Sequence, residues 1–198
     1  SAASDVYKRQ LQGTYPVISL SFARIKERDY EKTKQKMCEV LRNIYIKFCY
    51  IKDSEKLTDA DRAYYERMLE ENIKETDATS SLYQLSDFLY RYYGKKVIIL
   101  LDEYDTPMQE AFVDGYWDEL VAFTRSLFNS TFKTNPALER GIMTGITRVS
   151  KESVFSDLNN LKIVTTTSNE YASVFGFTEK EVFDALEQYG LEKEKKEV

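Results

Sequence analysis

The feature that most constrains the fold of this chain is an aliphatic run, VIILL (97–101), that leads directly into the acids of DEYD (102–105). A parallel strand that is buried on both faces of a sheet reads as a continuous aliphatic run. In open α/β sheets, ligands bind at the carboxyl ends of the strands. The run therefore predicts a buried strand that carries Asp102 and Glu103 to a ligand-binding edge.

Strand patterns alternate with helix patterns along the rest of the chain. Apolar spacing and capping signals predict helices over 29–51, 58–73, 81–94 and 117–132, with two more starting at Thr106 and Thr178, and strands over 15–22, 97–101, 141–150 and 162–167. Thr106 is expected to cap its helix, with Gln109 reaching back to it. This alternation predicts an α/β fold, with a mostly parallel sheet covered by helices on both faces.

Composition narrows the classes of function. The 198 residues carry a net charge of −5 and no histidine, which excludes Ser-His-Asp catalysis and leaves oxygen ligands for any metal, such as Mg²⁺. The acidity gives no sign of sequence-independent nucleic-acid binding, although a local basic patch stays open. Cys38 and Cys49 fall in one predicted helix and are expected to be core thiols in a reducing compartment. We find no membrane-spanning run and no signal peptide, so we expect a cytoplasmic protein.

The two adjacent acids are expected to have different roles. Neighbouring side chains on a strand point to opposite faces, so one carboxylate can hold a divalent cation while the other orients or deprotonates a water. This division of roles is expected of a nucleotide hydrolase. The alternative is that Asp102 and Glu103 simply begin a turn. The next helix has its own predicted cap in Thr106, which leaves the acids less explained by local structure.

Three segments in fixed order resemble the predicted AAA-ATPase-like family of bacterial P-loop proteins: VIILLDEYDTPMQEAF, GIMTGITRVSKESVFSDLNNL and YASVFGFTEKEV. The resemblance implies a partial P-loop NTPase core that uses ATP and Mg²⁺. It implies that Asp102 ligates magnesium through water and that Glu103 polarises the attacking water. It also implies a sensor of the γ-phosphate among Thr144, Thr147 and Arg148. The alternatives are β-propensity for the threonines and a surface ion pair for Arg148.

The motif that such an ATPase needs for phosphate binding, G-x-x-x-x-G-K-[ST], does not occur in the sequence. In the related family, that loop lies upstream of the strand that matches PVISLSF. Residues 1–10 include DVYKRQ, which is similar to the translation of a sequencing-library adaptor, and we interpret them as a cloning or sequencing artefact or a tail. Residues 11–198 would then be a partial domain. We expect it to bind nucleotide poorly and to be inactive alone. Family members often carry a C-terminal nuclease-like domain, which is the partner expected in cis.

Two other functions stay open. One is a metal-dependent nuclease that uses Asp102, Glu103 and Asp105. The other is a catalytically silent interaction module, to which the 15 tyrosines and 11 phenylalanines could contribute a partner surface.

Overall fold

The structure is a computed structural model that describes residues 13–146, 154–155, 158, 161–165, 168 and 177–191. The chain divides into two compact units, residues 1–159 and residues 160–198, which are considered separately.

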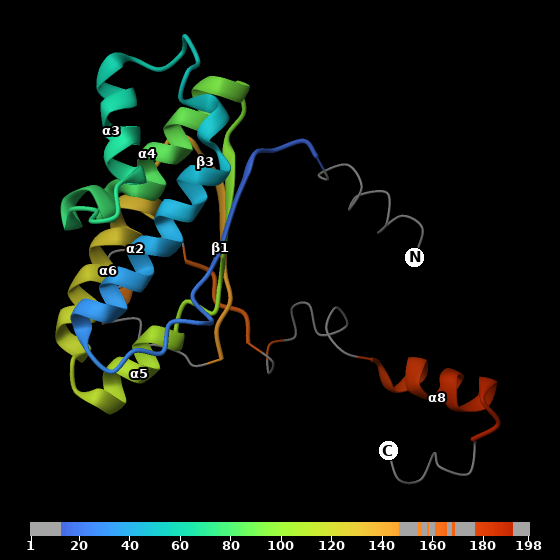
Figure 1. The fold of residues 1–198 in the computed structure, drawn as a ribbon. Coiled ribbons are helices and arrows are strands. Elements are labelled where there is room, and N and C mark those ends of the chain that lie inside the picture. Colours follow the sequence, from blue (N-terminus) through green and yellow to red (C-terminus); the bar gives the residue numbers. More distant parts are fainter. Residues whose placement is uncertain are drawn as a thin grey trace. The chain divides into compact units, whose positions relative to one another are not determined.

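The first unit is built on a parallel three-stranded sheet with the order β1-β2-β3 (Figure 1). The strands are β1 (Val17–Ser21), β2 (Val97–Asp102) and β3 (Leu138–Met143). Ser21 pairs with Asp102, and Leu101 pairs with Met143, so the three strands end at the same edge. The predicted α/β fold with a parallel sheet is confirmed.

Helices connect and cover these strands. They are α2 (Tyr30–Lys47), the 3₁₀-helix η1 (Cys49–Ile51), α3 (Asp59–Leu69), α4 (Glu75–Tyr93), α5 (Thr106–Asp114) and α6 (Trp117–Phe132). Several helix ends lie where the sequence predicts them. Asp29 caps α2 by accepting from the Lys32 amide, Thr58 and Asp61 form a capping box on α3, and Gly94 ends α4 with φ 67°.

Four predicted helix boundaries are wrong. Helix α3 ends at Leu69 instead of at residue 73. Helix α4 begins at Glu75, and Ser81 is buried inside it, where its hydroxyl donates to the Ala78 carbonyl. Helix α2 ends at Lys47, so Cys49 lies in η1 and is an exposed thiol rather than a core thiol. Helix α5 begins at Thr106, so that Asp105 rather than Thr106 occupies its N-cap position, without a side-chain capping bond.

One face of the sheet is buried and the other is not. Ile18, Ile99 and Leu101 lie on the buried face with 0–1% exposure, beneath the side on which Figure 1 shows α2, α4 and α6. The opposite face carries Val17, which is 37% exposed, and a half-buried Leu100. The prediction of a sheet covered on both faces is therefore wrong for the described residues. The alternating sequence of β1, VISLS, is the pattern of a half-buried strand.

The core lies between the sheet and the helices. Its largest fully buried side chains include Tyr45, Tyr65 and Phe88. Each buried tyrosine hydroxyl donates a hydrogen bond: Tyr45 to the Ser81 carbonyl and Tyr65 to the Tyr45 carbonyl, both at 2.7 Å. Buried polar groups must be bonded in this way to avoid a desolvation cost.

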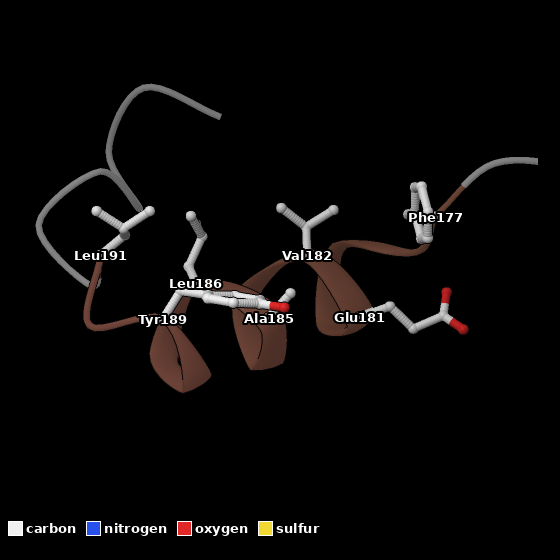
Figure 2. A pocket seen from close by; sticks show the side chains of 7 residues that line it. All are labelled: Phe177, Glu181, Val182, Ala185, Leu186, Tyr189 and Leu191. Atoms are coloured by element: carbon white, nitrogen blue, oxygen red, sulfur yellow. The ribbon is translucent and has the colours of Figure 1, made fainter.

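The second unit contains helix α8 (Glu179–Gln188), which starts with the predicted capping box between Thr178 and Glu181. Figure 2 shows Val182 and Leu186 on one side of this helix. A strand was predicted over 162–167. Residues 161–165 are described and have no regular secondary structure, so the prediction is wrong for that part. No helix in the described part of the chain has the length and apolarity needed to cross a membrane.

Candidate functional site

Polar side chains from all three strand ends meet at one edge of the sheet. Asp102 is the last residue of β2, and its carboxylate accepts a hydrogen bond from the Thr144 hydroxyl at 2.5 Å. On the other side, the Ser21 hydroxyl at the end of β1 donates to the same carboxylate at 3.5 Å. The parallel register brings them together, because Thr144 follows β3 directly and its amide donates to the Leu101 carbonyl. The result is an exposed carboxylate flanked by two hydroxyl groups.

Glu103 has a backbone conformation that L-residues rarely adopt. Its φ of 50° lies in the left-handed region, and it is the non-glycine residue with positive φ among the described residues. The Thr106 hydroxyl donates to its carboxylate at 3.0 Å, and its own amide donates to the Thr144 hydroxyl at 3.3 Å. A non-glycine residue in this region costs roughly 1–2 kcal/mol. Such strain concentrates at functional sites, where surrounding contacts hold the residue in place.

The turn that holds these acids is packed tightly against the segment after β3. Asp105 is fully buried, and the side-chain amide of Gln109 donates to the Asp105 carboxylate at 3.0 Å. A Cβ atom on Gly145 would lie 2.6 Å from Asp105 Oδ1 and 2.9 Å from a ring carbon of Tyr104. No side chain fits between these groups, so glycine at position 145 lets the two segments approach.

The three acids of DEYD do not form a shared metal cluster. Asp102 is bonded to Ser21 and Thr144, Glu103 to Thr106, and Asp105 to Gln109. Across the ranges that the structure describes, no three acidic or thiol side chains form a group that could hold a metal ion. The arrangement therefore gives no support to a nuclease that binds its metal through all three acids.

A single exposed carboxylate is still compatible with Mg²⁺. This ion usually keeps several waters and takes one or two carboxylates, with substrate phosphates completing its shell. Asp102 and its neighbouring hydroxyl groups supply only oxygen atoms. These residues fit a magnesium ion that is shared with a bound phosphate group.

The structure brings together three of the five site residues that the sequence predicts: Asp102, Glu103 and Thr144. The other two, Thr147 and Arg148, lie outside the described residues.

Sequence reasoning missed Ser21, Thr106 and Gly145. Ser21 ends a β-rich segment, which is the signal that could have placed it beside Asp102. Thr106 was interpreted as a helix cap, whereas its hydroxyl bonds Glu103.

Comparison with known proteins decides the family. The family described as "Predicted AAA-ATPase" (AAA-ATPase-like) matches residues 3–155, which is more than half of the chain. The chain belongs to this AAA-ATPase-like family. The match includes all the described residues of the strand-end site and confirms the resemblance that the motifs predicted.

A relative from Azotobacter chroococcum mcd 1 covers part of this AAA-ATPase-like chain. It is described as "Uncharacterized protein in vnfD 5'region" and is 30% identical over 90 residues, which are 45% of this chain and 17% of that protein. The chain thus matches well under two thirds of the length of its relative. No solved structure matches the chain.

Proposed function

We propose that the strand-end edge is the metal- and water-handling half of an ATP-hydrolysing site. The observation that carries the proposal is the junction of Ser21, Asp102 and Thr144 at the ends of three neighbouring parallel strands. Family membership supports nucleotide as the ligand.

Asp102 is the residue assigned to Mg²⁺, through water. It is exposed at the end of a strand that is buried on one face, so the protein offers a carboxylate without a further cost of burying it. The hydroxyl groups of Ser21 and Thr144 fix its orientation. When bound, the ion would neutralise charge on the terminal phosphates.

Glu103 is the residue assigned to the attacking water. In the structure, the Thr106 hydroxyl donates to the Glu103 carboxylate. The left-handed backbone at Glu103 directly follows Asp102, so the two residues differ in backbone conformation. A carboxylate in this position can orient a water and accept its proton. The role needs Glu103 to exchange its bond with Thr106 for one with water.

Thr144 is the first candidate for a residue that responds to the γ-phosphate. Its hydroxyl donates to Asp102 and accepts from the Glu103 amide, so it links the two acids. A phosphate that competes for this hydroxyl would change both contacts. Thr147 and Arg148 follow Thr144 in sequence and remain candidates for the same role.

The phosphate-binding loop and the nuclease-like domain are part of the proposal for the whole protein. We assign the loop to polypeptide upstream of β1, with residues 11–198 forming a partial domain. On this assignment the chain alone turns over ATP negligibly. The assignment would be supported if the gene for the whole protein encodes a glycine-rich loop with Gly-Lys-Ser or Gly-Lys-Thr upstream of β1.

The test is Glu103→Gln in the whole protein. We expect ATP binding to be retained and turnover to fall by at least about a hundredfold, which is a typical contribution of general acid–base catalysis. Glu119→Gln, an exposed glutamate on α6, is the matched control and should keep normal turnover.

Two results would redirect the proposal. Normal turnover in Glu103→Gln would remove the role given to Glu103. Absence of turnover and of nucleotide binding in the unaltered whole protein would select the catalytically silent interaction module instead.

A further inference from the structure

Exposed aromatic rings gather where α2 and α4 end. The side chains of Tyr50 in η1 and Tyr93 in the last turn of α4 are 51% and 46% exposed, and their hydroxyl groups are 2.6 Å apart. Tyr92 contacts both rings edge-on, with centroid distances of 5.9 Å to Tyr50 and 4.9 Å to Tyr93. These contacts hold in place two large rings whose exposed halves add nothing to the core.

Lysine side chains surround these rings. Lys47 is in the last turn of α2, just before η1. The Lys56 ammonium group donates to the Tyr92 carbonyl at 3.0 Å. Lys95 and Lys96 lie between α4 and β2. We call these three tyrosines and four lysines the basic surface: Tyr50, Tyr92, Tyr93, Lys47, Lys56, Lys95 and Lys96.

The lysines of the basic surface have no carboxylate partner. All four are exposed, and none forms an ion pair within the described residues. Neighbouring cations are already neutralised, because Lys52 pairs with Glu66 and Arg91 with Asp61. The exposed acids on neighbouring segments, none of which pairs with these lysines in the described part of the chain, are Asp53, Glu55 and Glu139. The four ammonium groups are therefore available to bind an anion.

Helix dipoles explain part of this charge but not the rings. A lysine near the C-terminus of a helix is stabilised by the helix dipole, which accounts for Lys47. It does not account for two half-exposed aromatic side chains among the lysines. Proteins that bind single-stranded nucleic acids use this combination, because bases stack on the rings while the cations contact the phosphates.

The basic surface lies at the far end of the sheet from the strand-end site. Lys95 and Lys96 precede β2, whereas Asp102 ends it, and a strand of this length spans about 20 Å. Figure 1 shows the last turns of α2 and α4 at the end of the first unit opposite to α5. Because the two sites do not overlap, binding to the basic surface does not depend on ATP hydrolysis.

We propose that the basic surface binds single-stranded nucleic acid without regard to base sequence. Tyr50 and Tyr93 stack on bases, and the lysines contact the phosphates beside them. A duplex is a poorer ligand, because its bases are stacked on one another and offer no free face to the tyrosines. The chain as a whole carries a net charge of −5, so the attraction is local to this surface.

Fluorescence anisotropy of a labelled oligothymidylate of about twelve nucleotides tests the proposal on the chain itself. The logarithm of the association constant should fall with the logarithm of the salt concentration with a slope of about −3. Each phosphate contact to a single strand contributes about −0.7 to this slope, and the surface offers four lysines. A blunt-ended duplex of the same length should bind at least about tenfold more weakly, because it lacks the stacking contacts.

Two sets of substitutions separate stacking from charge. Tyr50→Ala and Tyr93→Ala should each weaken binding by about fivefold or more, which is the size of effect that loss of stacking on one base produces. The salt slope should stay unchanged in both. Lys95→Ala combined with Lys96→Ala should reduce the magnitude of the slope by about 1.4, because two phosphate contacts are lost.

Each set has a matched control. Tyr50→Phe keeps the ring and should keep the affinity. Lys36→Ala combined with Lys74→Ala removes two exposed lysines, one in the first half of α2 and one just before α4, and should change neither affinity nor slope. Circular dichroism verifies the fold of each variant. Because Tyr50 and Tyr93 lie on different elements, either substitution alone is sufficient for the test.

Several results would overturn the proposal. One is the absence of oligothymidylate binding at low salt; if vesicles of phosphatidylserine and phosphatidylcholine bind instead, the surface contacts an anionic membrane. Equal affinity for the duplex, or normal binding by both tyrosine-to-alanine variants, would reduce the surface to a general polyanion contact. An equal loss of affinity in the two lysine pairs would place the nucleic acid elsewhere on the chain.

Discussion

Helices α2, α3 and α4, which form the helical layer, use polar groups differently from the strand-end edge of the sheet. In the layer, the hydroxyl groups of Tyr45 and Tyr65 are bonded to carbonyls inside the core, and Arg67 holds Asp77 through two bonds of 2.8 and 3.1 Å. At the edge, Asp102 is exposed and Glu103 has a strained backbone. In the layer these polar groups are paired with one another or with backbone carbonyls, whereas the edge retains features that stability does not explain. Proteins commonly accept such a cost at functional sites.

The largest effect that tests this contrast is expected in the layer. Phe88→Ala removes a fully buried ring from the middle of α4, and truncation of this kind costs about 3–5 kcal/mol. Urea unfolding should show a loss of this size. Tyr90→Ala on the same helix is the control, because Tyr90 is 40% exposed and should cost far less. Equal losses at the two positions would break the contrast between core and surface.

At the strand-end edge we expect a smaller change in the free energy of unfolding, and there a substitution by glycine should be more stable than one by alanine. Glycine adopts positive φ without strain, so Glu103→Gly should be about 1 kcal/mol more stable than Glu103→Ala. Both variants lose the bond to Thr106, so the comparison isolates the backbone. The matched control is the exposed Gln35 inside α2, where glycine should be less stable than alanine. If Glu103→Gly is no more stable than Glu103→Ala, the backbone is not strained and this support for a functional site is lost.

The smallest effect concerns the ion pair between α3 and α4. The hydrogen bonds from Arg67 lower the pKa of Asp77 below its usual 3.8, although desolvation opposes the shift. The folded state thus favours the ionised carboxylate, and this stabilisation is present above pH 3.8 and is lost as the pH falls through the folded pKa. Because Arg67 is 41% exposed, Asp77→Asn should cost no more than roughly 1 kcal/mol at neutral pH.

Unfolding of Asp77→Asn and of the unaltered chain across the acidic range gives the measurement. The difference between them should shrink as the pH falls below 3.8. A difference that stays constant with pH would mean that packing rather than charge joins the two helices there.

Local signals predicted much of the fold because they act over a few residues. Asp29, Thr58 and Gly94 mark helix ends by satisfying nearby backbone groups, and α6 begins and ends where its apolar spacing does. The start of α4 was missed because its cap residue, Lys74, makes no side-chain bond, while Ser81 and Gln84 further on imitate a capping box.

The site was predicted less completely because it depends on long-range register. The sequence placed Asp102 and Glu103 at a strand end, and the family resemblance added Thr144. Ser21 is 81 positions from Asp102, so only the pairing of β1 with β2 brings them together. The strain at Glu103 also depends on the contact with Thr144, and no local pattern signals it.

The most direct test of the strand-end site is the effect of Mg²⁺ on ATP affinity in the whole protein, compared between the unaltered form and Asp102→Asn. If Asp102 holds the ion, the unaltered protein should bind ATP more tightly with Mg²⁺ than with a chelator. Asp102→Asn should lose about tenfold of that gain, or about 1.4 kcal/mol, with unchanged affinity in the chelator. A variant that keeps the full Mg²⁺-dependent gain would contradict the assignment of the strand-end carboxylate to the metal.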